Sequence, residues 1–351
     1  MKIYRVIGLM SGTSLDGVDA ALLRTDGEGH IEREAFLTVP YEEGLRAGIR
    51  ACFNTAPDPE VERRLTVAHA EAIRQLGVSP QEVDLIGFHG QTISHAPERG
   101  HTCQIGDGAL LAGLTGIKVV NDFRTADVKA GGQGAPLVPV YHQALGSGLE
   151  KPLVFLNIGG VANVTYVGKN GELIAFDTGP GNALIDDWML QKTGQKFDEG
   201  GRIALSGEVN KALLKQLLAH PFFAAAVPKS LDRNAFVSRA WESLPLAEGA
   251  ATLAAFTVQS IVKAAEHFSD TPRQWIVAGG GRHNAFLMQQ LRQHIKAPVL
   301  SIDELGLNGD AIEAEAFAYL AVRSVRGLPL SFPATTGVAE PMTGGKLHAC
   351  R

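Results

Sequence analysis

Short apolar runs that end in glycine or in polar residues recur along the chain, and runs of this length predict buried strands. In the first half they occupy residues 3–9, 18–25, 31–38, 83–88 and 117–121. Segments that favour helices lie at about 42–53, 60–77 and 107–113, and the second of these has apolar residues at three-to-four spacing. Because short turns join the first three strands, the sequence predicts an antiparallel start.

The second half repeats this order of strand, glycine turn, strand, strand and helix. Its predicted strands lie at 153–158, 161–167, 173–176 and 275–278, and its predicted helices at about 182–193, 208–219, 247–267, from 284, and 310–326. The repetition predicts an α/β protein of two related domains that face each other across a cleft. We place the boundary near residue 145, which gives domains 1–145 and 146–351. The last helix either stays with the second domain or packs back onto the first.

The composition is that of a globular protein large enough for two cores. The chain has 351 residues, of which 45% are hydrophobic and 20% charged, and its net charge is -5. No basic stripe is present to neutralise a nucleic-acid backbone, and no apolar run approaches the ~20 residues of a membrane span. Three widely spaced cysteines form neither a zinc motif nor a disulfide framework. We therefore expect a soluble cytoplasmic protein without nucleic-acid or membrane partners.

Glycine is over-represented, with 40 residues where average usage predicts roughly 25. Much of the surplus lies in turns, where bare backbone can approach a ligand closely. The first such turn follows the first strand, and its backbone N–H groups and hydroxyls suit a phosphate group. An ordinary hairpin with polar turn residues is the alternative. The residues of this candidate phosphate turn are Gly12, Thr13, Ser14, Leu15, Asp16, Gly17, Val18 and Asp19.

Two further glycine turns lie in the second half of the chain. One joins two predicted strands and so repeats the place of the first turn. The other follows a strand and opens a helix, so its bare backbone can take a flat ring and the helix start can attract negative charge. Its spacing differs from the GxGxxG dinucleotide fingerprint. Three glycine turns in this order indicate a nucleotide site, and the further candidate residues are Asn157, Gly159, Gly160, Gly279, Gly280, Gly281 and Asn284.

Asp177 follows the predicted strand at 173–176 and precedes two glycines and a helix start at Asn182. A carboxylate at that depth is costly unless it has a partner or a chemical task. A general base that acts on a hydroxyl or a water molecule fits the position. A side chain that caps the turn is the alternative.

Polar residues also follow two strands of the first half, at the edge where open α/β sheets bind ligands. His89 and Gln91 come after the strand at 83–88, and Arg124 follows the strand at 117–121. Arg124 is suited to a two-point grip on a carboxylate or a phosphate. A solvated surface arginine is the alternative.

The three glycine turns together resemble those of the fold shared by sugar kinases, actin and the Hsp70 ATPase. Longer blocks, spread from residue 8 to residue 288, resemble the anhydro-N-acetylmuramic acid kinase family. The resemblance covers essentially the whole chain. Its blocks are GLMSGTSLDGVDAAL, FHGQTISH, NDFR, GGQGAPLVP, LNIGGVANVT, FDTGPGNALID, PKSLDRNAF and AGGGRHNAFLM.

This resemblance implies an ATP-dependent enzyme of peptidoglycan recycling, built from two actin/hexokinase/Hsp70-like domains with a central cleft. Such an enzyme opens the 1,6-anhydro ring of its sugar with water and phosphorylates O6, giving N-acetylmuramic acid 6-phosphate and ADP. The resemblance assigns ATP binding to residues 12–19 and the catalytic base to Asp177. It also implies that Arg124 holds the lactyl carboxylate, with His89, Gln91 and Glu315 as neighbouring sugar contacts.

Magnesium would accompany ATP, but the sequence departs from other sugar kinases at the expected place for it. Those enzymes usually carry an Asp two residues before the Gly-Thr turn, where this chain has Met10. The comparable residue of the second turn is Asn157. The ion would then be held mainly by ATP oxygens and water, or by Asp16 or Asp19. These alternatives stay open.

Two rival functions are compatible with the same fold. One is a phosphohydrolase that acts without a sugar acceptor, and the other is an actin-like or Hsp70-like ATP switch. The sequence offers neither an extra peptide-binding domain nor an evident filament surface. A homodimer is the assembly that a cytosolic kinase of this size suggests.

Overall fold

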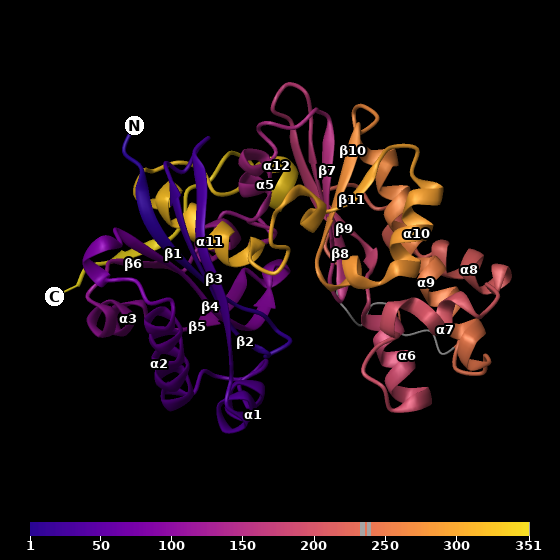
Figure 1. The fold of residues 1–351 in the computed structure, drawn as a ribbon, viewed down its shortest axis with the longest axis horizontal. Coiled ribbons are helices and arrows are strands. Elements are labelled where there is room, and N and C mark those ends of the chain that lie inside the picture. Colours follow the sequence, from indigo (N-terminus) through magenta and orange to yellow (C-terminus); the bar gives the residue numbers. More distant parts are fainter. Residues whose placement is uncertain (232–235, 237–239, 351) are drawn as a thin grey trace. The chain divides into compact units, whose positions relative to one another are not determined.

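The computed structural model describes residues 1–231, 236 and 240–350, and the chain divides into two compact units (Figure 1). Unit 1 consists of Met1–Ser147 together with Ala311–Arg351, and unit 2 of Gly148–Asp310. A single division at residue 145 would leave the last 41 residues with the second half, whereas the structure groups Ala311–Arg351 with unit 1. The last helix therefore packs on the first domain, which is the alternative that the sequence left open.

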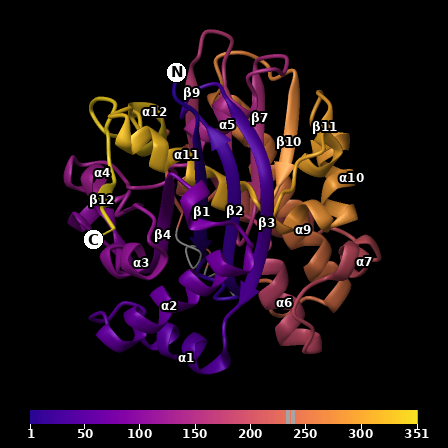
Figure 2. The ribbon, with the colours of Figure 1, turned by 60° about the vertical axis from the view of Figure 1, so that its left-hand side comes forward.

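Unit 1 is built on a mixed sheet whose main path has the order β12-β6-β4-β1-β2-β3, with β5 paired to β4. Figure 2 shows β1, β2 and β3 side by side. The strands are β1 (Tyr4–Ser11), β2 (Gly17–Thr25), β3 (Ile31–Pro40), β4 (Leu85–Ala96), β5 (His101–Ile105), β6 (Val119–Asn121) and β12 (Lys346–His348). The α-helices are α1 (Glu43–Ala51), α2 (Pro59–Gln75), α3 (Gly108–Thr115), α4 (Thr125–Lys129), α5 (Pro139–Leu145), α11 (Ile312–Val325) and α12 (Pro333–Thr336).

Helix α11 lies against β1 and β4 at two glycines. Gly8 and Gly87 are register partners in these neighbouring parallel strands. A Cβ atom on Gly8 would lie 1.8 Å from the carbonyl oxygen of Ala314, and one on Gly87 would lie 2.0 Å from that of Phe317. Since only glycine allows so close an approach, these two positions explain why the C-terminal helix closes the core of unit 1.

Unit 2 is built on a five-stranded sheet with the order β11-β10-β7-β8-β9. Its strands are β7 (Leu153–Ile158), β8 (Val161–Val167), β9 (Leu173–Pro180), β10 (Gln274–Ala278) and β11 (Val299–Ser301). Its α-helices are α6 (Ala183–Thr193), α7 (Arg202–Leu205), α8 (Lys211–Leu218), α9 (Leu246–Lys263) and α10 (Ala285–His294).

The two sheets share one strand order. In each unit the first three strands form an antiparallel meander, and two further strands lie parallel to the first on its other side. The matching orders are β3-β2-β1-β4-β6 and β9-β8-β7-β10-β11. This duplication confirms the predicted α/β architecture of two related domains.

Two predicted strand ends are wrong. Strand β4 continues beyond residue 88 to Ala96, and β9 continues beyond residue 176 to Pro180. Each contains a glycine that reads as a turn in the sequence, but the register shifts there by one residue, so the strand continues through a bulge. His89, Gln91 and Asp177 therefore lie within strands. The sequence also missed the short elements β5, β11, β12, α4, α5, α7 and α12.

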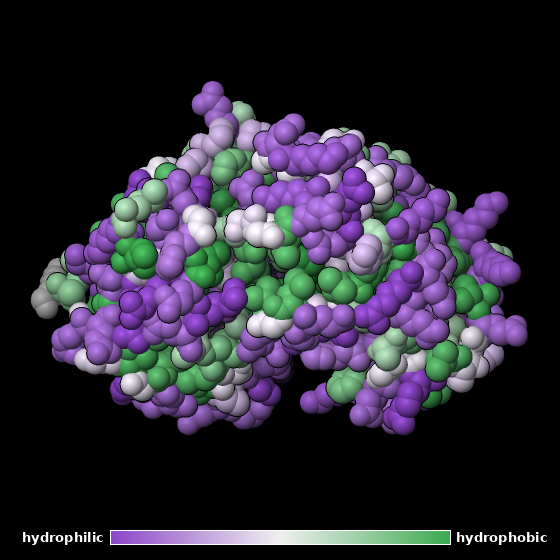
Figure 3. All heavy atoms as spheres, turned by 45° about the horizontal axis from the view of Figure 1, so that its top comes forward, coloured by the Kyte–Doolittle hydropathy of each residue, from purple (hydrophilic) through white to green (hydrophobic). Residues whose placement is uncertain are grey.

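Hydrophobic residues form small patches among hydrophilic ones on the face drawn in Figure 3. Among the described residues, no helix combines the length and apolarity needed to cross a membrane. The apolar core of unit 1 instead lies between its sheet and the helices packed on it, and it includes Ile7, Leu9, Phe88 and Leu111.

Candidate functional site

The candidate phosphate turn joins β1 to β2 and is tied to the segment that follows β3. The Leu15 N–H donates to the Gly12 carbonyl at 3.1 Å, and the Leu15 carbonyl accepts from Arg46 Nε at 3.0 Å. The Tyr41 N–H donates to the Asp16 carbonyl at 3.2 Å. Leu15 is buried and has a φ of 60°, a left-handed conformation that is costly for a leucine. Backbone strain of this kind concentrates at ligand-binding turns.

The side chains of this turn divide into two groups. Thr13, Ser14 and Asp16 are exposed, whereas Leu15 and Val18 are buried in the core of unit 1. The buried pair can offer a ligand only backbone groups. The hydroxyls of Thr13 and Ser14 and the carboxylate of Asp16 are therefore the side-chain groups that the turn presents to solvent.

The two glycines of the turn have different surroundings. A Cβ atom on Gly12 would meet only the Ser14 hydroxyl, at 3.8 Å. One on Gly17 would lie 2.2 Å from the Val39 carbonyl oxygen. Gly17 is thus required for packing of β2 on β3, and Gly12 leaves its backbone open.

A row of register partners crosses the end of the unit 1 meander. Met10 in β1 lies opposite Asp19 in β2, and Asp19 lies opposite Thr38 in β3. The Asp19 carboxylate accepts a hydrogen bond from the Thr38 hydroxyl at 2.6 Å. Directly paired residues share one face of a sheet, so this carboxylate lies at the same face and level as Met10.

Gln91 lies in a buried hydrogen-bonded chain beside the turn. The Tyr41 hydroxyl donates to Ser11 Oγ at 2.6 Å, and Ser11 Oγ donates to Gln91 Oε1 at 2.6 Å. Ser11 and Gln91 are completely or almost completely buried. The Gln91 side chain is thus held inside unit 1, where it supports the end of β1.

His89 and Arg124 are in direct contact. Arg124 Nε and Nη2 lie 3.1 and 2.9 Å from His89 Nε2, and Arg124 Nη1 donates to the Gly134 carbonyl at 2.8 Å. Burial lowers the pKa of Arg124 to about 10, while the Glu313 and Asp127 charges oppose this shift. At neutral pH Arg124 stays a cation with two of its five N–H donors unused by these partners, which suits a two-point contact with an anion.

Two acidic residues at the start of α11 differ in their surroundings. Glu315 is 4% exposed, and its carboxylate accepts from the Tyr141 hydroxyl at 2.6 Å. Burial raises the pKa of Glu315. Desolvation by the surrounding protein also raises the pKa of Glu313, an effect that the Arg124 charge opposes and the Asp19 charge reinforces. Glu313, a candidate beside Glu315 in the sequence that was not placed among the predicted site residues, is therefore the electrostatic neighbour of two of them.

In unit 2 an equivalent row crosses the sheet from β7 to β9. Asn157 lies opposite Asn163, and Asn163 lies opposite Asp177. All three residues are half-buried, as expected for one face of the sheet at its edge. At about 4.8 Å per strand, Asp177 lies about 10 Å from Asn157. Asn163 is a further member of the row that sequence reasoning missed, although its alternation with Asn157 across the glycine turn was visible.

The Asp177 carboxylate is oriented by the segment before residue 232. The Asp177 N–H donates to the Lys229 carbonyl at 2.9 Å, and Asp177 Oδ2 accepts from the Leu231 N–H at 2.8 Å. Burial raises the pKa of Asp177 to about 6, an effect that the Leu231 N–H partly opposes. Residues 232–235 of the PKSLDRNAF block lie outside the described residues.

The two glycine turns of unit 2 meet where β7 and β10 end. Asn157 is the register partner of Ala278, the last residue of β10. Gly279 has a φ of 74°, and a Cβ atom there would lie 2.3 Å from Asn157 Oδ1. One on Gly281 would lie 2.4 Å from Ile158 Cγ2. Gly280 is exposed, and the nearest atom to its Cβ position is 3.9 Å away.

The turn after β7 also contacts the end of β9. The Gly159 carbonyl accepts from the Asn182 N–H at 2.7 Å, and the Gly160 carbonyl accepts from the Gly181 N–H at 2.9 Å. Gly160 is exposed and Gly159 half-buried. The structure thus brings Gly159 and Gly160 together with the segment that leads out of the Asp177 strand.

The remaining nucleotide candidate, Asn284, caps α10. Its side-chain oxygen accepts from the Leu287 N–H at 3.1 Å, so it stabilises the start of this helix. Arg282, two residues earlier, is buried between Asp303 and Asp310 at 2.8 and 2.9 Å and donates to the Gly279 carbonyl at 3.1 Å. This arginine fixes the glycine turn in place.

A sequence model of the family described as anhydro-N-acetylmuramic acid kinase matches residues 4–349. The chain belongs to the anhydro-N-acetylmuramic acid kinase family. This membership confirms the family resemblance that the sequence blocks indicated. Because the family is one of kinases, the chain is an enzyme.

Curated relatives of the anhydro-N-acetylmuramic acid kinase family match over nearly their whole length. One from Rhizorhabdus wittichii is 54% identical over 357 residues, which cover 97% of this chain and 98% of the relative. One from Rhodospirillum rubrum is 52% identical over 347 residues, which cover 97% of this chain and 92% of the relative. Both are named anhydro-N-acetylmuramic acid kinase. A solved structure of ligand-bound xylulose kinase from Lactobacillus acidophilus is 11% identical, covers 99% of this chain and 94% of that one, and has a TM-score of 0.47.

Asp16 and Asp19 suit a metal ion that is bound together with a nucleotide. In the described part of this family member, no three His, Cys, Asp or Glu side chains gather as a metal site. Asp16 is exposed on the turn, and Asp19 is bonded to Thr38. Since magnesium commonly keeps several waters and takes one or two carboxylates besides phosphate oxygens, these residues fit an ion held mainly by ATP.

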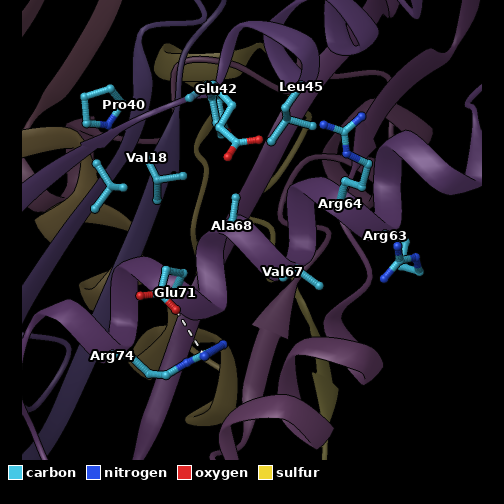
Figure 4. A pocket seen from close by; sticks show the side chains of 12 residues that line it. Val18, Pro40, Glu42, Leu45, Arg63, Arg64, Val67, Ala68, Glu71 and Arg74 are labelled. Atoms are coloured by element: carbon cyan, nitrogen blue, oxygen red, sulfur yellow. Dashed lines mark ion pairs between the residues drawn. The ribbon is translucent and has the colours of Figure 1, made fainter.

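A pocket of about 450 Å³ lies beside the supports of the phosphate turn (Figure 4). Val18, Tyr41, Leu45 and Ala68 contribute to its wall. Val18 is the one sequence-predicted site residue in this lining, as far as the chain is described. The pocket reaches the turn through Val18 itself and through Tyr41, whose N–H donates to the Asp16 carbonyl, and its lining includes neither His89 nor Arg124.

Proposed function

We propose that the chain opens 1,6-anhydro-N-acetylmuramic acid with water and phosphorylates it from ATP, giving N-acetylmuramic acid 6-phosphate and ADP in peptidoglycan recycling. The water oxygen adds to the anomeric carbon as the bond from that carbon to O6 breaks. O6 takes the γ-phosphoryl group of ATP, and ADP leaves. Asp177 takes the proton of the attacking water.

The environment of Asp177 is the observation that carries this proposal. A pKa of about 6 leaves the carboxylate mostly ionised at neutral pH and more basic than an ordinary aspartate. Oδ2 is occupied by the Leu231 N–H. Among the described residues Oδ1 has no hydrogen-bond donor, so it is the oxygen that would accept the proton from water.

Arg124 would bind the lactyl carboxylate of the sugar. The two N–H donors that His89 and Gly134 leave unused and the charge that Arg124 retains at neutral pH support this role. His89, which accepts from Arg124, holds the guanidinium rather than the sugar. Gln91 and Glu315 are weaker sugar contacts, because both side chains are buried and bonded within unit 1.

ATP would bind to the glycine turns. The turn at 12–19 and the residues Asn157, Gly159 and Gly160 would take the phosphates, and Gly279–Gly281 would lie under the adenine ring. Magnesium would neutralise the transferring phosphoryl group, held by ATP oxygens and water with help from Asp16 or Asp19. A cytoplasmic location, where ATP is available, and a homodimer complete the proposal.

A phosphate-transfer assay tests this function. With γ-labelled ATP, magnesium and the anhydro sugar, we expect label in a product that is heavier than the sugar by one phosphate plus one water, measured by mass spectrometry. A gain of phosphate alone would exclude the coupled ring opening. Phosphate release that is independent of the sugar would favour the rival phosphohydrolase.

A further inference from the structure

The glycine-rich loop at 131–134 is wrapped around the side chain of Asp127. The Gly132 N–H donates to the Asp127 carbonyl at 2.9 Å, and the Gly134 N–H donates to Asp127 Oδ1 at 2.6 Å. A Cβ atom on Gly132 would lie 2.3 Å from that same oxygen. Gly134 has a φ of 67°, which favours glycine. The two glycines are thus explained by the approach of backbone to one carboxylate.

The other oxygen of Asp127 is bonded by the C-terminal segment. Oδ2 accepts from the Thr336 hydroxyl at 2.6 Å and from the Ser331 hydroxyl. The Gln133 N–H donates to the Thr336 carbonyl at 2.7 Å. Asp127, Ser331 and Thr336 are each at most 2% exposed. Such a buried carboxylate is tolerated because its oxygens are hydrogen-bonded.

Asp127 is connected to Arg124 through a single residue. Gly134 donates its N–H to Asp127 and accepts Arg124 Nη1 on its carbonyl at 2.8 Å. Any rotation of Gly134 would move the acceptor that, with His89, sets the plane of the guanidinium. The Asp127 charge also favours the charged form of Arg124.

We propose that Asp127, held by Ser331 and Thr336, is a positioning residue that aims the Arg124 guanidinium at the carboxylate of the sugar. This inference rests on the proposed function, in which Arg124 binds that carboxylate. It gives the C-terminal segment at 331–336 a part in substrate selection. A merely structural role of Asp127 would lower stability without changing how the enzyme distinguishes a charged from an uncharged sugar.

The test compares binding of 1,6-anhydro-N-acetylmuramic acid with binding of its carboxamide, by calorimetry. We expect the wild-type chain to prefer the acid at least tenfold. The double variant Ser331→Ala/Thr336→Val and the variant Asp127→Ala should lower this preference at least threefold, with the KM for ATP within twofold of wild type. Asp127→Asn, whose amide oxygen can still accept from Gly134, should retain more of the preference than Asp127→Ala.

Thr252→Val is the matched control for a lost buried hydroxyl. Thr252 lies in unit 2, is fully buried, donates to the Glu248 carbonyl at 2.7 Å and accepts from the Asn210 N–H at 2.9 Å. It should lose stability but keep the acid preference. If Asp127→Ala does not fold, the double hydroxyl variant decides.

The outcomes separate this inference from the proposed function. A wild-type chain that prefers the acid, with variants that keep the same ratio, would overturn the positioning role alone. A wild-type chain that binds acid and carboxamide equally would overturn the Arg124 contact, and the positioning role with it. A lowered ratio in the Asp127 and double variants, with an unchanged ratio in Thr252→Val, supports the inference.

Discussion

Arg124 donates to a single ring nitrogen of His89, with Nε and Nη2 of the arginine 3.1 and 2.9 Å from His89 Nε2. The other ring nitrogen, Nδ1, lies 2.7 Å from the Gly90 carbonyl oxygen and so carries the proton. Burial, and then the Arg124 charge, lower the pKa of His89 well below its ordinary value. His89 is therefore a neutral acceptor at assay pH, which makes it a support for Arg124 rather than an acid.

Replacing His89 separates its acceptor role from its packing role. His89→Phe keeps a ring beside Phe317, whose centroid is 4.5 Å from that of His89, but removes the acceptor. Since a hydrogen bond to a charged group contributes about 1.5–3 kcal/mol, we expect the KM for the sugar to rise about 10- to 100-fold. The KM for ATP should stay within twofold. His89→Gln, which keeps an acceptor oxygen, should raise the KM for the sugar less than His89→Phe does, as measured by steady-state kinetics. An equal rise in the two variants would contradict the acceptor role.

The pKa of Asp177 sets the expected pH dependence of turnover. A base with a pKa of about 6 is protonated in acid, so kcat should fall tenfold per pH unit below about pH 6 and level off above it. Asp177→Asn should lower kcat by about 10²–10⁴-fold at pH 7.5. Calorimetry should find ATP and sugar binding within threefold of wild type. Turnover within tenfold of wild type would refute the assigned base.

The same shift has the opposite consequence for stability. Folding raises the pKa of Asp177 from 3.8 to about 6, so the folded chain binds this proton more tightly than the unfolded chain. The group therefore destabilises the fold increasingly as the pH rises from about 4 to 6, and fully above that. The Tm of Asp177→Asn minus the Tm of wild type should therefore be larger at pH 7.5 than at pH 4.5. Scanning calorimetry of both chains at the two pH values measures this difference. A Tm difference that does not change with pH would mean that folding does not raise the pKa of Asp177.

The sequence is sufficient to predict the duplicated architecture because its signals are local. Each meander is marked by short apolar runs and glycine turns, and each long helix by its apolar spacing. The place of Asp177 within β9 is different, because it depends on a bulge opposite Asn163 in the neighbouring strand. A glycine at 179 reads as a turn until that pairing is known.

The candidate site shows the same limit more sharply. Arg124 is recognisable from its place after a strand, but Asp127 is bonded to Ser331 and Thr336, which lie 204 and 209 residues further along the chain. No local sequence pattern predicts a contact between residues so far apart in the chain. Likewise, the spacing of Glu313 and Glu315 on one helix does not predict their different partners. Glu315 accepts a hydrogen bond from Tyr141, whereas the charge of Arg124 acts on Glu313.

Glu313 and Glu315 form a matched pair for mutation. Glu315→Gln keeps an acceptor for Tyr141 in the core, so we expect the KM for the sugar within threefold of wild type and a Tm that is lower by a few degrees. Glu313→Gln removes a charge beside Arg124 and Asp19, so kcat/KM for the sugar should fall about tenfold with little change in Tm. Steady-state kinetics and thermal unfolding of both variants measure these changes. A large loss of kcat/KM for the sugar in Glu315→Gln, with little loss in Glu313→Gln, would make Glu315 the sugar contact.

The glycine turn after β10 allows a test that separates packing from nucleotide contact. Gly279→Ala forces a side chain into a left-handed conformation and to within 2.3 Å of Asn157 Oδ1, so it should lower the Tm by several degrees. Gly280→Ala adds its Cβ atom to open space, 3.9 Å from the nearest atom, and should leave the Tm within 1 °C. If the adenine ring lies on the bare backbone here, however, the same methyl group stands between ring and peptide. Gly280→Ala should then raise the KM for ATP at least fivefold, with the KM for the sugar unchanged. An unaltered KM for ATP would move the adenine ring away from this turn.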